Sequence, residues 1–159
     1  MSATSTVAGL EKLTMNLTKE IRVKASLEHT FEALLEQMGP ENETPQGKMP
    51  MTIEPWPGGR WFRDLDGHNG HYWATVQAIK RPELLELCGP LFMSYPVINN
   101  LQYRLTRIEE GTRITFRHSA LGVIPDEVWE GMTHGWANLW DRIQRAATTR
   151  VADFQHPLL

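Results

Sequence analysis

Cysteine is nearly absent from this chain of 159 residues. Its single cysteine, Cys88, rules out an internal disulfide bond. Cys88 stands in an apolar run with Leu84, Leu85 and Leu87, a setting typical of a buried side chain. We therefore expect Cys88 to be a small buried hydrophobe rather than a reactive thiol.

Long hydrophobic runs are absent as well. No apolar stretch approaches the roughly 20 residues that a helix needs to cross a bilayer. The N-terminus lacks the cationic start and following apolar run of a secretory signal. These absences predict a soluble cytoplasmic protein without a membrane span.

Neither sign of charge dominates the sequence. Its 16 basic and 19 acidic residues give a net charge of −3, and no basic stripe or block is present. Proteins that bind nucleic acid usually gather Lys and Arg on one face. We therefore expect no nucleic-acid partner.

The motifs that usually announce metal or phosphate chemistry are missing too. Asp64, Asp66, His68 and His71 cluster in the sequence, but their spacing lacks the other ligands of a calcium loop. It also lacks the Cys and His pairs of a structural zinc site, so a polar hairpin turn is the better interpretation. The pair Gly58–Gly59 precedes a strand and not a helix, unlike a phosphate loop. We expect no metal and no cofactor.

Tryptophan, by contrast, is plentiful, with six copies. Residues 125–147 predict one long helix, which Pro125 and Asp126 open with a fixed φ and a side-chain acceptor. A helix with so wide an apolar face needs a curved sheet to lie against, and such packing often leaves a cavity. The apolar residues of this face recur at steps of three and four: Trp129, Met132, Trp136, Leu139, Trp140, Ile143 and Ala147.

The first half of the chain predicts a strand and a shorter helix. Residues 15–25 alternate, which places Leu17, Ile21, Val23 and Ala25 toward a core, with a break at Lys19 or Glu20 left open. Ser26 can cap a helix over residues 27–38. Residues 39–50 are rich in Gly, Pro, Asn and Glu and predict a loop or a short second helix.

The middle of the chain predicts a meander of short strands joined by short turns, which implies antiparallel pairing and an α+β fold. We expect one domain over residues 14–149, with a flexible segment 1–13 before it and a tail 150–159 after it. The predicted strands cover residues 51–54, 60–65, 71–79, 84–88, 100–108 and 112–119.

Four stretches of this sequence, in order, resemble one protein family. The junction 54–61, Glu-Pro-Trp-Pro-Gly-Gly-Arg-Trp, looks like the P-G-G-R-W/F motif of the SRPBCC superfamily, in the branch named after the activator of the heat-shock protein 90 ATPase. Residues 25–34 resemble its first strand-to-helix junction, and residues 111–119 its G-G-T-R strand. Gly135 and Trp136, followed by Leu139 and Ile143, resemble the G-W motif of its final helix.

The resemblance implies a START-like helix-grip fold, in which a curved antiparallel sheet of about six or seven strands wraps around a long C-terminal helix. Members of the superfamily include lipid and polyketide binders, aromatase/cyclase enzymes, resistance proteins and a co-chaperone domain. They share a cavity and not a catalytic set. The resemblance therefore implies a cavity and leaves the function open.

The residues themselves suggest which side chains meet in that interior. In the last strand, Phe116 and His118 share the apolar face, and Tyr103 points inward from its partner strand. Ser119 points away from His118, which excludes a Ser–His nucleophile pair. In residues 60–65, Trp61 and Arg63 share a face, and the pattern fits either face inside. A buried Arg63 would pair with Glu54, although both can also face water.

These faces define a candidate ligand site. His118 and Tyr103 are the only candidates for an acid or base, and a core histidine satisfied by a hydrogen bond explains His118 equally well. Likewise, a plain hydrophobic core explains the tryptophan stripe. The candidate ligand-binding residues are Trp129, Met132, Thr133, Trp136, Tyr103, Phe116, His118 and Trp61.

Three functions fit this sequence. The first is binding or sequestration of a small, largely apolar ligand, of aromatic or lipid-like type, in a cavity between sheet and helix. The second is an enzyme of cyclase, dehydratase or isomerase type that acts in the same cavity. The third is a protein-interaction module like the co-chaperone that names the branch. The expected partner is a small apolar molecule, and the protein is expected to be a monomer or homodimer.

Overall fold

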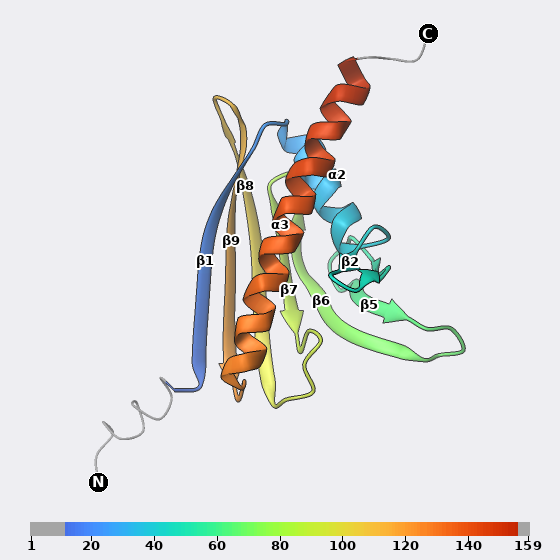
Figure 1. The fold of residues 1–159 in the computed structure, drawn as a ribbon, viewed down its shortest axis with the longest axis vertical. Helices are drawn as coiled ribbons and strands as arrows, with labels where there is room; N and C mark the ends of the chain where they lie inside the picture. Colours follow the sequence, from blue (N-terminus) through green and yellow to red (C-terminus); the bar gives the residue numbers. More distant parts are fainter. Residues whose placement is uncertain (1–11, 156–159) are drawn as a thin grey trace.

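The chain folds as a strand, a helix, a series of strands and one long helix, the order that its sequence predicts (Figure 1). The computed structural model describes residues 12–155. Most of the segment 1–13, predicted to be flexible, thus lies outside the described residues. The elements within them are β1 (Thr14–Val23), α2 (Leu27–Met38), β2 (Glu43–Thr44), β3 (Gly47–Lys48), β4 (Thr52–Ile53), β5 (Arg60–Asp64), β6 (Gly70–Lys80), β7 (Leu84–Gly89), β8 (Val97–Ile108), β9 (Gly111–Gly122) and α3 (Asp126–Gln155).

Seven strands form one antiparallel sheet, in the order β1-β9-β8-β7-β6-β5-β4. This arrangement confirms the predicted α+β class and the antiparallel meander. β1 pairs with β9 along its whole length without a register shift, so the break considered at Lys19 or Glu20 does not occur. β8 and β9 are longer than predicted, because their pairing continues to Val97 opposite Gly122.

The first helix forms where the sequence places it. The Ser26 hydroxyl accepts a hydrogen bond from the backbone N–H of His29 at 3.1 Å, which satisfies one of the free donors at the start of α2. Phe31, Leu34 and Met38 lie on its buried face. The Gly39 N–H then donates to the Glu36 carbonyl at 3.1 Å and ends the helix.

The segment after α2, predicted as a loop or a short second helix, is a small hairpin, so the helical alternative is wrong. β2 and β3 pair antiparallel, and two bonds between Asn42 and Met49 close the hairpin at its base. The Met49 N–H donates to the Asn42 carbonyl at 2.9 Å, and the Asn42 amide donates to the Met49 carbonyl at 3.0 Å. We call residues 42–49 the 42–49 hairpin.

The long helix α3 lies across one face of the curved sheet, with α2 beside it (Figure 1). The Pro125 carbonyl accepts hydrogen bonds from the N–H groups of Val128 and Trp129, which starts the helix at Asp126. The helix continues to Gln155, past its predicted end at Ala147, because no Gly or Pro interrupts the sequence there. Part of the segment expected to be a tail, 150–155, is therefore helical. Within residues 12–155, no helix is long and apolar enough to cross a lipid bilayer.

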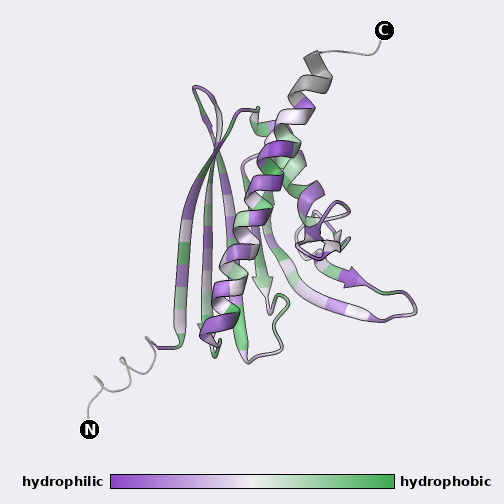
Figure 2. Ribbon diagram, viewed as in Figure 1, coloured by the Kyte–Doolittle hydropathy of each residue, from purple (hydrophilic) through white to green (hydrophobic). Residues whose placement is uncertain are grey.

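Side chains sort by the sheet face on which they lie, as the alternation of colours along the strands shows (Figure 2). Leu85 and Leu87 of β7 point inward and are fully buried. Cys88 lies on the opposite face and is only half-buried, so the prediction of a buried cysteine is wrong. Glu86 lies on the same face as Cys88, and strand alternation decides which residues are inside.

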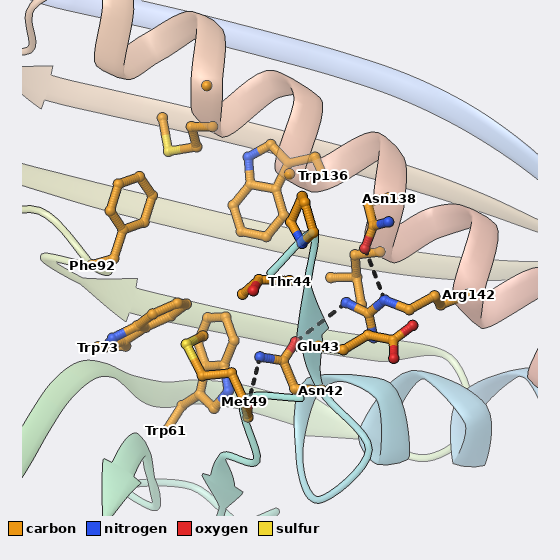
Figure 3. A pocket seen from close by; sticks show the side chains of 15 residues that line it. Asn42, Glu43, Thr44, Met49, Trp61, Trp73, Phe92, Trp136, Asn138 and Arg142 are labelled. Carbon is orange, nitrogen blue, oxygen red and sulfur yellow. Dashed lines mark hydrogen bonds between the residues drawn. The ribbon is translucent and has the colours of Figure 1, made fainter. Parts of the chain in front are cut away.

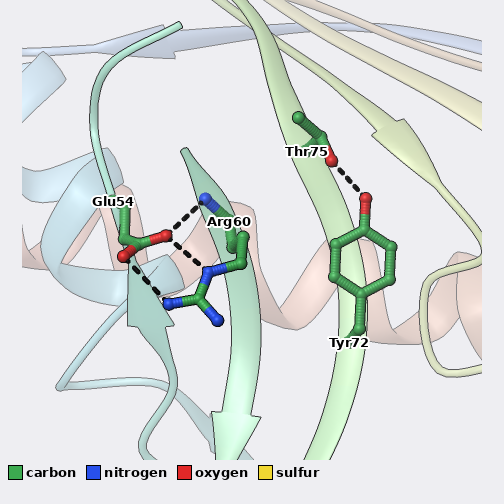
Figure 4. A network of polar contacts seen from close by, with 4 residues as sticks. All are labelled: Glu54, Arg60, Tyr72 and Thr75. Atoms are coloured by element: carbon green, nitrogen blue, oxygen red, sulfur yellow. Dashed lines mark hydrogen bonds and ion pairs between the residues drawn. The ribbon is translucent and has the colours of Figure 1, made fainter. Parts of the chain in front are cut away.

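The question left open for β5 is also answered. Trp61 faces the interior with 2% of its surface exposed. Glu54 pairs with Arg60 and not with Arg63 (Figure 4). Its carboxylate accepts from the Arg60 backbone N–H at 2.9 Å and from the guanidinium Nε at 2.8 Å, which clamps the turn between β4 and β5. These hydrogen bonds hold the pKa of Glu54 below its usual value.

The packing predicts unequal roles for two tryptophans of α3. Trp140 is 8% exposed and packs edge-on against Phe116, whereas Trp129 is only partly buried near the start of the helix. We expect Trp140→Ala to destabilise the fold by about 3–5 kcal/mol, and Trp129→Ala by clearly less. Chemical denaturation measures both. Trp140→Phe is the control, because it keeps a ring and removes an indole N–H that has no hydrogen-bond partner in the described part of the chain. Equal losses for the two alanine variants would contradict this assignment.

Candidate functional site

His118 lies at the centre of a buried polar relay that links the sheet to α3. Its side chain is fully buried, as its alternation with outward residues of β9 predicts. The Trp136 indole N–H donates to Nδ1 of His118 at 3.1 Å. Nε2 of His118 lies 2.7 Å from Oδ1 of Asn99. The Asn99 amide in turn donates to the Gly89 and Pro90 carbonyls.

This relay fixes the protonation state of the imidazole. An indole nitrogen can only donate, so Nδ1 of His118 is the acceptor and Nε2 carries the proton that goes to Asn99. Burial lowers the pKa of His118 to about 4, which keeps the ring neutral at ordinary pH. Both ring nitrogens are occupied by protein partners. The arrangement is that of a satisfied core histidine, with side-chain partners.

The aromatic residues around His118 pack on one another rather than around a space. The Phe116 ring lies 4.9 Å from Tyr103, 5.3 Å from Trp136 and 5.1 Å from Trp140 between centroids. The Trp129 ring lies 5.3 Å from that of His118. The Tyr103 hydroxyl has no hydrogen-bond partner among residues 12–155, and burial raises its pKa well above the usual value. This cluster is the interior of the fold behind Trp136.

The Thr133 hydroxyl forms a hydrogen bond within its own helix. Oγ1 donates to the Trp129 carbonyl one turn earlier at 3.0 Å, a bond common for threonine within helices. Of the eight predicted ligand-binding residues, the structure thus gathers Tyr103, Phe116, His118 and Trp129 into the packed interior, with Thr133 beside them on α3. The other three, Trp61, Met132 and Trp136, also border a pocket.

The pocket lies on the other side of Trp136, between α3, the 42–49 hairpin and strands β5 and β6 (Figure 3). Its volume is about 140 Å³, and it opens to solvent. An apolar cavity of about 150 Å³ is large enough to hold benzene. Seven apolar side chains carry most of its wall: Met49, Trp61, Trp73, Phe92, Met132, Trp136 and Leu139.

The aromatic part of the wall is held rigidly. The Trp61 indole N–H donates to the Met38 carbonyl at 2.7 Å, which fixes that ring against the end of α2. The Trp73 ring packs edge-on against Trp61 at 5.0 Å, and Phe92 lies 5.9 Å from Trp73. Rings held in this way present flat apolar faces to the pocket at little cost in side-chain entropy.

Two glycines of α3 line the pocket. Gly131 and Gly135 lie one helical turn apart and both line it. A Cβ atom added at either position would meet no atom within 4 Å. Glycine inside a helix costs roughly 0.5–1 kcal/mol relative to alanine, so the helix gives up stability where it borders this space.

One edge of the pocket is polar and centres on Arg142. This arginine is 5% exposed, and its guanidinium extends from α3 toward the 42–49 hairpin (Figure 3). Nε donates to Oδ1 of Asn138 at 3.0 Å, and Nη2 donates to Oδ1 of Asn42 at 3.3 Å. Nη1 donates to the backbone and side-chain oxygens of Gln37, at 3.2 and 2.8 Å. Arg142 therefore ties α3 to α2 and to the hairpin.

Sequence reasoning missed much of this pocket. Trp73 and Phe92 lie outside the helix and the three strands that supplied the predicted residues. The 42–49 hairpin reaches the site only through tertiary packing. Arg142 is absent from the predicted site because a search for apolar periodicity does not select a charged residue. The glycines were a usable signal, since two glycines spaced by one turn are costly in a helix.

The acidic and histidine cluster after β5 forms a tight turn. The Asp66 N–H donates to a carboxylate oxygen of Asp64 at 2.9 Å, and Asp66 and His68 adopt positive φ. Within residues 12–155, no group of three or more His, Cys, Asp or Glu side chains is placed to hold a metal ion.

Comparison with known proteins identifies relatives in sequence and in fold. The family model described as "Activator of Hsp90 ATPase homolog 1-like protein" matches residues 24–148. No curated protein matches the chain.

Three solved structures share the fold. A protein of unknown function from Staphylococcus aureus is 13% identical, with a TM-score of 0.65 over 87% of this chain and 96% of that one. The protein MLL2253 from Mesorhizobium loti is 18% identical, with a TM-score of 0.62 over 85% and 98%. The di-domain ARO/CYC StfQ from the steffimycin biosynthetic pathway is 10% identical, with a TM-score of 0.69 over 92% of this chain and 54% of that one. At such identities the likeness establishes the fold alone, here the helix grip.

The buried relay predicts an acid-sensitive fold. The unfolded chain protonates His118 near pH 6.5, whereas the folded chain resists protonation down to about pH 4. The stability that His118 contributes is therefore complete above pH 6.5 and declines by roughly 3 kcal/mol as the pH falls to 4. We expect thermal melts of His118→Gln to lose less stability over this range than the wild type. The exposed His134→Gln is the control, and an unchanged pH dependence in His118→Gln would refute the assignment.

The glycines predict a gain in stability. Gly135→Ala should stabilise the protein by about 0.5–1 kcal/mol, because the helix gains a better helix former and the added methyl group meets open space. Urea unfolding measures the change. Gly122→Ala is the contrasting variant: its φ is +137° and a Cβ would lie 2.2 Å from the Pro96 carbonyl oxygen, so it should destabilise. A loss of stability in Gly135→Ala would show that its surroundings are closed.

Proposed function

The chain belongs to the Activator of Hsp90 ATPase homolog 1-like family, and on that premise we propose that it binds a small, largely apolar molecule, with an aromatic ring, in the pocket between α3 and the 42–49 hairpin. The observation that carries the proposal is the pocket itself. Its wall is mostly aromatic and apolar, and a few polar groups lie on one edge. Such a combination is typical of sites for small molecules.

The dimensions of the pocket restrict the ligand. A volume of about 140 Å³ is below the 300–1,000 Å³ of sites that enclose a drug-sized ligand. It fits one ring system among Trp61, Trp73 and Trp136, and any longer part of the ligand extends through the opening. A long acyl chain would require the interior around Phe116 to open, which makes a lipid the less suitable ligand.

The candidate binding residues divide into two roles in this proposal. Trp61, Met132 and Trp136 contact the ligand together with Trp73 and Phe92. His118, Tyr103, Phe116, Trp129 and Thr133 support Trp136 from behind and make no direct contact with the ligand. The proposal thus moves the centre of the predicted site from the sheet side of Trp136 to the hairpin side.

Catalysis in the pocket has less support than binding. Both nitrogens of His118 are occupied, and the Tyr103 hydroxyl is buried away from the pocket lining with a raised pKa. Neither residue is poised as an acid or base near neutral pH. Likeness to a two-domain ARO/CYC protein at 10% identity does not transfer its activity. We therefore favour a binding protein over a cyclase. We also favour it over a co-chaperone-like module, because no surface described above supports such a role.

A fluorescence titration tests the proposed site. We expect wild-type protein to bind a small neutral aromatic probe such as 1-naphthol, with quenching of tryptophan fluorescence. Trp73→Ala should weaken binding about tenfold or more, because it removes one flat wall of the pocket. Trp56→Ala is the matched control, since Trp56 is 55% exposed and lies outside the pocket. Equal effects of the two variants, or no binding by the wild type, would refute the site.

A further inference from the structure

Arg142 is a buried cation without a carboxylate partner. Five other arginines of the described chain, at positions 22, 60, 81, 145 and 150, form ion pairs with Asp or Glu. Those arginines keep much more of their side chains in water than Arg142, which is 5% exposed. Within residues 12–155, no carboxylate oxygen lies within 4 Å of the Arg142 guanidinium. A buried charge without a counterion is costly.

Neutral oxygens compensate this charge only in part. A guanidinium has five N–H groups, and Arg142 places four of them on amide or carbonyl oxygens of Gln37, Asn42 and Asn138. The fifth, on Nη2, has no acceptor among the described residues. Nη2 is the nitrogen that extends toward Asn42 at the polar edge of the pocket (Figure 3). The aromatic walls and the Arg142 side chain border the same pocket.

We propose that Arg142 recognises an anionic group and that the ligand of this pocket is a small aromatic carboxylate, an inference that rests on the binding function proposed above. The ring lies among Trp61, Trp73 and Trp136, and the carboxylate accepts a charge-assisted hydrogen bond from Nη2 of Arg142. Such bonds are roughly twice as strong as those between neutral groups. The ligand supplies the counterion that the protein does not.

The charges that face Arg142 agree with this assignment. Glu43 of the hairpin also lines the pocket and lies close enough to raise the pKa of Arg142, against the larger effect of burial, which lowers it. Glu43 is exposed and forms no ion pair with the guanidinium. Arg145, one turn later on α3, is held by Asp141 at 3.0 Å. Arg142 is therefore the free positive charge at the pocket, and Glu43 is a negative charge that an anionic ligand must approach.

Benzoate and benzamide test the inference, since they share shape and ring but differ in charge. We expect wild-type protein to bind benzoate about tenfold more tightly than benzamide in isothermal titration calorimetry. Arg142→Gln should remove most of this preference, because the affinity for benzoate falls much more than the affinity for benzamide. Arg145→Gln, which removes an exposed arginine from the same helix, is the matched control and should keep the preference.

A second variant keeps the test decisive where Arg142→Gln fails to fold. Glu43→Gln lies on the exposed hairpin, and it should raise the affinity for benzoate roughly two- to fivefold, more than it changes that for benzamide. Equal binding of benzoate and benzamide by the wild type, or an undiminished preference in Arg142→Gln, overturns the inference and leaves the proposed function standing. An unchanged benzoate affinity in Glu43→Gln counts against it in the same way. Absence of binding for both compounds overturns the proposed function as well.

Discussion

The hydrogen bond from the Trp136 indole to His118 is the interaction on which the rest of the structure depends. It joins α3 to β9 at the middle of the interface between helix and sheet, and the relay continues through Asn99 to the loop after β7. One face of the Trp136 side chain therefore belongs to the packed interior, next to Phe116, while another borders the pocket. A change in the position of Trp136 would alter the core and the candidate site together.

Most of the fold could be predicted from the sequence, because it follows from local rules. The Ser26 cap and the spacing of apolar residues define α2, and the tryptophan stripe defines α3 from its start. Alternation along β8 and β9 places Tyr103, Phe116 and His118 inside. The predictions failed where local pattern and tertiary context differ. Cys88 is an apolar residue on the face of β7 that also carries Glu86, and the 42–49 hairpin has too few residues for a periodic signal.

The site could be predicted only in part, for a related reason. Periodicity identifies side chains that point toward the interior, but it does not distinguish those that fill it from those that border a space. Trp136 and Phe116 satisfy the same pattern, and only the arrangement of neighbouring elements separates their roles. Met132 and Trp61 border the pocket because the 42–49 hairpin stands off from them there. Gly131 and Gly135 border the same pocket, and their cost to the helix is a feature that can be read from the sequence.

The same reasoning applies to charge. A fold selected for stability alone would fill the position of Arg142 with an apolar residue, since replacing buried charges by well-packed hydrophobic side chains is often neutral or stabilising. Arg142 does have a structural role, because its bonds to Gln37 and Asn42 join α2 and the hairpin to α3. A glutamine has two N–H donors and could make part of these bonds at a smaller desolvation cost. What glutamine cannot supply is a positive charge beside an aromatic wall, and that charge is the feature which neither the core nor the hairpin requires.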